Sequence, residues 1–456
     1  MAEKINAFCE ELDISLKDLI PGVDTKNLDE TELKKIMATI ETHQDVYVKA
    51  VKENSQSVSL FLFHKNFKYG RRFLFQRKLK SIKSDVDYKF IECFASVIEQ
   101  ELKVLSVPDF DGVIERSLRE TRFRRAIAEF SAFDSQKVFR WVKAMEDSIL
   151  LTYEQRPARH IIMTPKKIEK FRIEQKKACL FFKKPLPLEE GLINEKWIRS
   201  VVDGKKVALL SEETNKSANI IGIISLDNLE SPSKKQEEAL AAPHFSVVKL
   251  QTILEPKDVV MFAAPTGDLI IMMGKEVVFQ KTQGFWRYHN YFNLHSKIIK
   301  YVKRIDVAKD LLRIVLDLSY ERKGALFCIS EAKRIPKIID DPDSQKQGNK
   351  TLREAFIGFN ISEWNVRRII SSVASTDGAV MLDENGEIHD VACVIGDLTT
   401  EESNNLTEEQ KKDRDGLVGT RSLAAWRASR HGLAIKISED GPITLFEDFV
   451  EVGKYG

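Results

Sequence analysis

The C-terminal part of the chain contains the stretch that decides its fold, DGAVMLDENGEIHDVACV at residues 377–394. Two apolar runs, 378–382 and 388–394, flank Glu384-Asn385-Gly386. An Asn-Gly pair between apolar runs is typical of a tight hairpin turn, because both residues tolerate positive φ. We therefore predict two antiparallel strands joined at Asn385-Gly386.

The neighbouring segments extend this hairpin into a larger sheet. Apolar residues recur at helical spacing over 307–315, and Lys323-Gly324 is predicted to end that helix, with the glycine as a left-handed cap. Further apolar runs predict strands at 325–329, 433–437 and 443–446, with a helix around 423–426. Because helices and strands mix without strict alternation, we expect an α/β chain of mixed α+β character, with a mixed sheet covered by helices on its faces.

The rest of the chain suggests three regions. Residues 1–155 are expected to be a mainly helical N-terminal region, with one aromatic-rich strand at 57–63. Residues 156–240 are expected to form a small mixed α/β region, whose polar end, 227–242, is a candidate linker or exposed loop. Residues 245–456 are expected to form one domain, with a hairpin extension at its N-terminal side that closes on 284–288.

Composition limits the classes of protein. The 71 Lys and Arg side chains nearly balance the 69 Asp and Glu side chains, so any affinity for nucleic acid or membrane must be local. No apolar run approaches the roughly 18 residues of a membrane span, and acidic residues lie where a signal peptide needs an apolar core. The five cysteines are scattered without a CxxC pair, which argues against a disulfide framework and a zinc knuckle. We expect a cytoplasmic protein without a membrane partner.

Two short motifs carry the chemistry of a ligand site. Asp377-Gly378-Ala379 begins the hairpin and pairs a small residue with a carboxylate that suits a divalent cation. Gly419-Thr420-Arg421 opens a predicted helix, where backbone N–H groups, a hydroxyl and a guanidinium together suit phosphate oxygens. Each motif alone is weak, so its context decides its weight.

Five segments in chain order resemble the diadenylate cyclase domain, the N-terminal domain of the DisA family. They are LLRIVLDLS (311–319), KGALFCI (323–329), DGAV (377–380), GTR (419–421) and ISEDG (437–441). The resemblance covers about residues 300–450, a third of the chain. The hairpin that ends at 284–287 is also similar to an extra N-terminal part of cyclase-like domains that are thought to sense nucleotides.

The resemblance implies an activity and a set of site residues. Enzymes of the family join two ATP molecules into cyclic di-AMP across a face-to-face pair of domains, with Mg²⁺ or Mn²⁺ as cofactor. Asp377 would bind the metal and position the attacking hydroxyl, which makes it the implied catalytic residue. The implied nucleotide-binding residues are Gly378, Ala379, Gly419, Thr420, Arg421, Ser438 and Glu439.

The chain departs from the family at two positions. Where the family has Arg-His-Arg, this chain has Arg421-Ser422-Leu423, so two phosphate-contacting side chains are missing. Lost cations weaken the charge stabilisation on which phosphoryl transfer depends. Arg427, Arg430 and His431 follow and are candidates to replace them. The acidic segment 399–415 between the motifs is expected to be a solvated loop or a lid.

Three hypotheses for function follow. The first is a sensor, in which a cyclase-like domain binds an adenine nucleotide or a cyclic dinucleotide. The second is an active diadenylate cyclase. The third is a nucleic-acid-binding protein that uses the basic and aromatic run HKNFKYGRRFLFQRKLKSIK (64–83), which has eight Lys or Arg and no acid. We favour burial of these aromatics in a core over nucleic-acid binding. A second basic cluster, Arg116 to Arg125, is expected to be a partner-binding face or ordinary surface.

Overall fold

The computed structural model divides into two compact units, Met1–Glu230 with Ile253–His289, and Ser231–Thr252 with Asn290–Gly456. The structure describes residues 2–20, 23–39, 46–54, 57–64, 69–76, 85–105, 112–153, 156–157, 159–203, 206–215, 217–229, 245–263, 267–274, 276–282, 284–288, 291–340 and 350–455.

The first unit contains a four-stranded antiparallel sheet in the order β1-β4-β3-β2. The region predicted to be mainly helical therefore holds a sheet as well. Alternation along its strands buries Leu60, Leu62 and Phe73 on one face, where they join the core of the unit. The strands are β1 (Val23–Asn27), β2 (Val46–Asn54), β3 (Ser57–His64) and β4 (Tyr69–Gln76). The helices of this region are α1 (Ala2–Leu19), α2 (Glu30–Thr39), α3 (Asp85–Leu105), α4 (Gly112–Phe130) and α5 (Ser135–Ile149).

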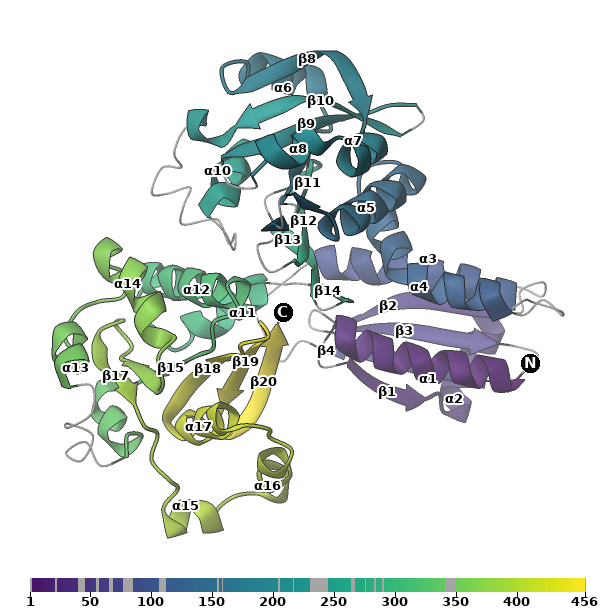
Figure 1. Ribbon diagram of the computed structural model, residues 1–456. Coiled ribbons are helices and arrows are strands. Elements are labelled where there is room, and N and C mark those ends of the chain that lie inside the picture. Colours follow the sequence, from purple (N-terminus) through teal and green to yellow (C-terminus); the bar gives the residue numbers. More distant parts are fainter. Residues whose placement is uncertain are drawn as a thin grey trace. The chain divides into compact units, whose positions relative to one another are not determined.

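A second sheet of the first unit has eight strands in the order β14-β13-β12-β11-β7-β9-β10-β8 (Figure 1). Its strands are β7 (Ile161–Thr164), β8 (Cys179–Pro187), β9 (Val207–Glu213), β10 (Ala218–Ser225), β11 (Val259–Ala263), β12 (Leu269–Met273), β13 (Glu276–Thr282) and β14 (Phe285–Tyr288). Two short strands, β5 (Thr152–Tyr153) and β6 (Arg156–Pro157), pair with each other. The short helices around the sheet are α6 (Ile168–Glu174), α7 (Leu188–Asn194), α8 (Lys196–Val201) and η1 (Leu226–Asn228).

This sheet changes the place of the predicted hairpin extension. The strands β12, β13 and β14 form the expected meander, but β12 pairs with β11, which pairs with β7. The meander thus belongs to the first unit rather than to the C-terminal domain. The predicted linker 227–242 lies outside the described residues beyond Leu229, and the division between the units falls within it.

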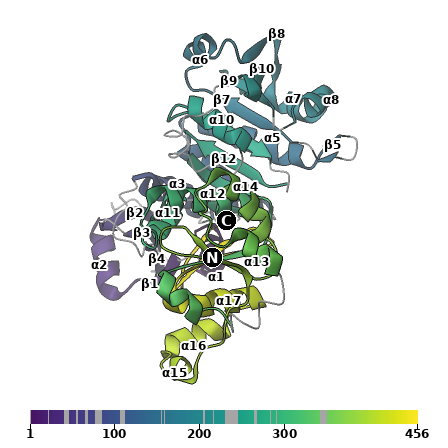
Figure 2. The ribbon, with the colours of Figure 1, turned by 90° about the vertical axis from the view of Figure 1, so that its left-hand side faces the viewer.

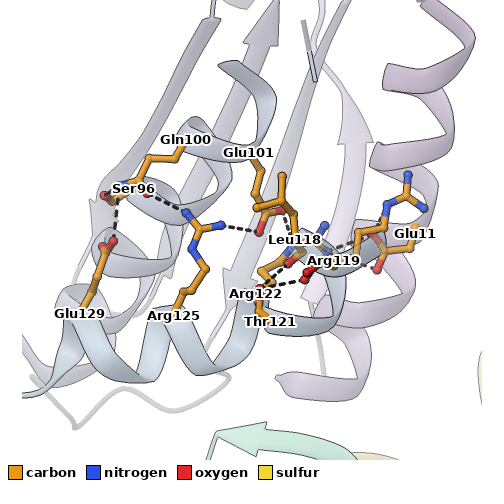
Figure 3. A network of polar contacts seen from close by, with 11 residues as sticks. Glu11, Ser96, Gln100, Glu101, Leu118, Arg119, Thr121, Arg122, Arg125 and Glu129 are labelled. Carbon is orange, nitrogen blue, oxygen red and sulfur yellow. Dashed lines mark hydrogen bonds and ion pairs between the residues drawn. The ribbon is translucent and has the colours of Figure 1, made fainter. Parts of the chain in front are cut away.

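A buried ion-pair network links three helices of the first unit (Figure 3). Arg122 on α4 is fully buried and donates through Nε to Glu101 of α3 at 2.7 Å. Its Nη1 donates to Glu11 of α1 at 3.1 Å. Arg125 donates to Glu101 and to Gln100. Arg122 and Arg125 of the basic cluster are therefore neutralised by carboxylates of neighbouring helices, and Arg122 is an interior residue rather than a surface residue.

The second unit is built on a six-stranded mixed sheet in the order β17-β16-β15-β18-β19-β20. Its strands are β15 (Ala325–Ser330), β16 (Ala379–Leu382), β17 (Ile388–Cys393), β18 (Gly432–Ile437), β19 (Ile443–Glu447) and β20 (Val450–Tyr455). The α-helices of this part of the chain are α10 (Phe245–Ile253), α11 (Tyr291–Ile299), α12 (Ile305–Tyr320), α13 (Lys350–Phe356), α14 (Trp364–Ala374), α15 (Thr400–Asn404), α16 (Glu408–Asp415) and α17 (Thr420–Ala428). The described part of this unit also includes the 3₁₀ helices η2 (Ala332–Lys337) and η4 (Ser429–His431).

Helices cover both faces of this sheet, as the mixed α+β prediction requires (Figures 1 and 2). On one face, Leu326 and Ala434 pack with Trp426 of α17. The Trp426 indole donates to the carbonyl of Phe449 at 2.7 Å, which fixes the helix over the β19–β20 hairpin. Figure 2 shows α12 and α14 on the opposite side of the sheet from α17.

Most predicted elements of the second unit are present. The hairpin is confirmed, since β16 pairs antiparallel with β17, and so are the helix 307–315, the helix around 423–426 and the three predicted strands. The acidic segment 399–415 forms two short helices, α15 and α16, each opened by a capping box. Their first turns are satisfied by side chains, Thr399 with Glu402 and Thr407 with Gln410.

The predicted glycine cap of α12 is wrong. Arg322 takes the left-handed conformation, with φ 55°, and Gly324 does not have a positive φ. Gly324 instead leaves space for the side chain of Arg421, as described below.

Candidate functional site

One edge of the six-stranded sheet brings the predicted site residues together. There β15 begins, its parallel neighbour β16 begins, and its antiparallel neighbour β18 ends. Ala325 is paired with Ile437, so Ser438 and Glu439 follow β18 directly beside Gly324. Phe327 is paired with Val380, and continuing that parallel register backwards places Asp377 beside Gly324. Motifs from three separate segments thus meet at one edge.

Arg421 reaches this edge from the first turn of α17. Its Nη1 donates to Glu439 Oε1 at 3.4 Å. A Cβ added to Gly324 would overlap the guanidinium, and even Cζ of Arg421 would lie 2.9 Å from it. Gly324 therefore provides the space that Arg421 occupies. The side chain of Glu439 is 77% exposed, and such surface pairs contribute little, so an incoming anion competes for Arg421 on favourable terms.

Gly419 leaves the start of α17 open. It has φ 89° at the N-cap, and a Cβ there would meet nothing within 4 Å. Thr420 is exposed next to it. The free N–H groups of a first helical turn favour an anion, and the open space in front of Gly419 leaves them accessible.

Backbone conformation and close packing require a glycine at position 378, which the sequence motif alone does not show. Its φ is 107°, and an added Cβ would overlap the backbone of Ala392 in β17. Ala392 itself has φ 52°, where the register of β16 and β17 shifts. Ala379 is buried within β16. Gly378 and Ala379 therefore shape the strand pair that carries Asp377, and packing explains both residues.

The two positions that depart from the family present no cation. Ser422 is buried and donates to the carbonyl of Val418 at 2.8 Å. Leu423 packs against the core beneath α17.

The three candidates to replace the missing cations are engaged elsewhere. Arg427 pairs with Asp397 at 2.5 Å. Arg430 lies 3.4 Å from Glu402 and donates to the carbonyl of Lys337 at 2.7 Å. His431 lies 3.7 Å from Glu402, and burial together with nearby Arg430 lowers the pKa of His431. These contacts attach α15 and the loop at 396–397 to the end of α17.

Sequence reasoning missed Lys436, which the structure places beside Ser422. Lys436 lies on β18, paired with Leu326 on the face that α17 covers. Its Nζ donates to Ser422 Oγ at 2.8 Å. Burial lowers the pKa of Lys436, Asp440 and Glu451 oppose that shift, and Lys454 and Arg421 add to it. The only signal in the sequence is one lysine in an otherwise apolar strand, two residues before Ser438.

Of the two carboxylates among the predicted site residues, Glu439 is paired with Arg421, which leaves Asp377 as the candidate metal ligand. It is exposed at the start of β16, and the structure gives it no ion pair among the described residues. No group of three His, Cys, Asp or Glu side chains that could hold a metal occurs within the described ranges. Mg²⁺ is commonly bound by one or two carboxylates together with the phosphates of a substrate. Asp377 fits a cation that arrives with a nucleotide, and not a site formed by protein alone.

The basic and aromatic run 64–83 is described only in part, at 64 and from 69 to 76. In that part, Phe73 is fully buried. Arg72 donates to Glu53 at 2.8 Å and to Glu32 at 3.1 Å, and its guanidinium lies 5.4 Å from the ring centroid of Phe61. These contacts favour the interpretation that the aromatic residues of the run are buried in a core over the interpretation that they form a nucleic-acid-binding surface. The remainder of the run lies outside the described residues.

No protein-family model matches the chain, and no curated protein matches it. Among the helices that the structure describes, none has the length and apolar character needed to cross a membrane.

Proposed function

We propose that the second unit binds an adenine nucleotide, or a cyclic dinucleotide made from adenine nucleotides, at the edge formed by β15, β16, β18 and α17. The observation that carries the proposal is the position of Arg421, which fills the space left by Gly324 and, among the described residues, is paired with the exposed carboxylate of Glu439. A guanidinium at an open helix start is suited to phosphate oxygens. The resemblance to diadenylate cyclase domains supplies the adenine nucleotide as the ligand class.

Sensing is favoured over synthesis. Phosphoryl transfer needs cations placed around the developing charge, and here Ser422 and Leu423 stand where the family has two of them. The cations that follow, Arg427 and Arg430, are paired with Asp397 and Glu402. Binding needs fewer cations than catalysis, which supports a site that holds a nucleotide without efficient turnover.

A specific observation keeps synthesis as the second candidate. Asp377 is exposed and has no ion pair within the described part of the chain. A divalent cation held by Asp377 and the ligand's phosphates would neutralise phosphate charge and activate a ribose hydroxyl. By the same resemblance, an active unit would face a second copy of the chain.

Incubation of the purified chain with ATP and Mn²⁺, followed by analysis of free and protein-bound nucleotides, separates these candidates. Nucleotide retained by the protein without turnover supports the sensor. Cyclic di-AMP that accumulates in excess over protein overturns the ranking in favour of synthesis. If neither ATP nor cyclic di-AMP binds, the proposed ligand class is wrong.

The first prediction concerns Arg421. Arg421→Ala should weaken binding of ATP or cyclic di-AMP by roughly 1.5–3 kcal/mol, the scale of a hydrogen bond to a charged group. Calorimetric titration measures the change. Arg304→Ala is the matched control, because Arg304 is exposed at the opposite end of α12, where it pairs with Asp306. Equal affinities for wild type and Arg421→Ala would remove Arg421 from the site.

A further inference from the structure

Lys436 is a partly buried ammonium group whose charge has no direct counter-ion. The structure records no ion pair for it among the described residues, and its Nζ donates to the neutral hydroxyl of Ser422. Partly buried lysines are usually paired, because removing an ammonium group from water costs free energy. An unpaired ammonium in this position therefore has unused capacity to bind an anion.

Lys436 lies next to the first turn of α17, where the proposed nucleotide site is located. Lys436 is on the sheet face that α17 covers, and Ser422 lies in the first turn of that helix, one residue after Arg421. The cross-strand partner of Lys436 on β19 is Thr444, and the next partner on β20 is Lys454. The charges that influence Lys436 are the cations Arg421 and Lys454 and the carboxylates Asp440 and Glu451. Two cations, Arg421 and Lys436, thus approach the start of α17 from the helix and from the sheet.

We infer that Lys436 is a second phosphate-binding cation of the site, held in position by the hydroxyl of Ser422. This inference rests on the proposed nucleotide site. It assigns a purpose to Ser422: the residue that stands where the family has a histidine orients a lysine from the neighbouring strand. Lys436 on β18 would thus supply a positive charge in place of the family's histidine at position 422 of α17, although from a different position.

The test compares binding of four probes, ATP, cyclic di-AMP, pyrophosphate and adenosine, to the full chain. Lys436→Gln retains a polar side chain and removes the charge. It should weaken binding of the three phosphate-containing probes roughly tenfold to a hundredfold, the scale of one charged hydrogen bond. Adenosine binding should not change. The salt dependence of phosphate binding should also become shallower, because one screened charge has been removed.

Two further variants separate charge from structure. Ser422→Ala keeps the ammonium and removes its support, so affinity should fall only a few-fold and the salt dependence should stay as in wild type. Lys411→Met is the matched control, because Lys411 lies on α16 and its Nζ is already paired with Glu408 of the same helix at 2.8 Å. It should bind all probes as wild type does. If Lys436→Gln does not fold, as judged by its urea midpoint, Lys436→Met, which keeps the apolar stem, takes its place.

Each outcome is decisive. Unchanged affinity and salt dependence in Lys436→Gln, together with weakened binding in Arg421→Ala, would overturn the role of Lys436 and leave the nucleotide site standing. An equal loss for adenosine and for the phosphates would show that Lys436 supports the fold rather than a phosphate. If wild type binds none of the probes, the proposed function fails, and the inference fails with it.

Discussion

Gly324 shows how one residue is read differently from sequence and from structure. As the residue after Lys323 at the end of a helix, it has the sequence context of a left-handed cap. The structure gives that conformation to Arg322 and gives Gly324 the task of leaving space for Arg421. The absence of a side chain at Gly324 is therefore needed to make room for Arg421, and not to allow a left-handed backbone conformation.

Gly324→Ala should consequently affect binding more than stability. The backbone at Gly324 has no positive φ, so alanine is not strained there, and the loss of unfolded-state entropy favours it by up to about 1 kcal/mol. The new methyl group must displace the guanidinium of Arg421. Affinity for ATP or cyclic di-AMP should therefore fall, though by no more than in Arg421→Ala because the guanidinium is displaced rather than removed, while the urea midpoint changes little.

The control for this prediction is a double variant. In an Arg421→Ala background, Gly324→Ala should cost no further affinity, because both changes remove the same contact. Gly416→Ala, where an added Cβ would make only ordinary contacts at 3.5 Å, should bind as wild type does. Additive losses in the double variant would mean that Gly324 acts on the ligand by another route.

At the scale of elements, α12 carries a carboxyl group that opposes folding near neutral pH. The charges that act on Asp317 are Arg313 of the same helix, Glu321 directly after its end, and Arg367 of α14. Burial raises the pKa of Asp317 to about 7, against the attraction of Arg313 and Arg367. Arg367 is already held by Asp310 at 2.6 Å, so it neutralises Asp317 only in part.

The sign of the pH dependence follows from this raised pKa. Between the unfolded value of 3.8 and the folded value of about 7, the folded state binds more protons than the unfolded state. The contribution of Asp317 to stability is therefore present at low pH and is lost as pH rises to 7. Asp317→Asn should raise the free energy of unfolding at pH 8 by roughly 1–3 kcal/mol, after allowance for solvent screening, and should change it little at pH 4.

Urea unfolding at pH 4, 6 and 8 measures this difference. Asp306→Asn is a control of opposite sign, since the hydrogen bond from Arg304 lowers the pKa of Asp306. That variant should lose stability at pH 8 rather than gain it. An Asp317→Asn variant whose stability tracks wild type at all three pH values would contradict the account.

Elements also mark the limit of what the sequence predicts. Short apolar runs and turn residues are local signals, and they place β15, β18 and the β16–β17 hairpin correctly. They do not specify the partner of a strand, which is why the sequence predicts the 269–288 meander as part of the C-terminal domain whereas its strand β12 pairs with β11 of the first unit. Lys436 was missed for a related reason: its nearness to Ser422 depends on the register of β18 and on the placement of α17, which only tertiary packing sets.

At the scale of the whole molecule, each of the two units has its own charged interior. In the second unit, Arg353 of α13 is buried and pairs with Asp390 of β17. In the first unit, Arg122 and Glu101 are buried within the three-helix network (Figure 3). All residues of the proposed nucleotide site belong to the second unit. Stability of the first unit and affinity of the site should therefore respond to different substitutions.

Arg122→Ala tests this separation. It leaves Glu101, whose pKa is already raised by burial, without its closest cation, so the first unit should lose roughly 3–5 kcal/mol of stability. Replacing both partners, as Arg122→Met with Glu101→Leu, should recover much of the loss, because apolar residues of similar size tolerate burial. Urea unfolding followed by circular dichroism measures stability, and titration with ATP at 10 °C measures affinity. Affinity should equal that of wild type as long as the variant is folded at that temperature. Weaker binding by a folded Arg122→Ala variant would show that the first unit contributes to the nucleotide site, and that the second unit alone does not account for it.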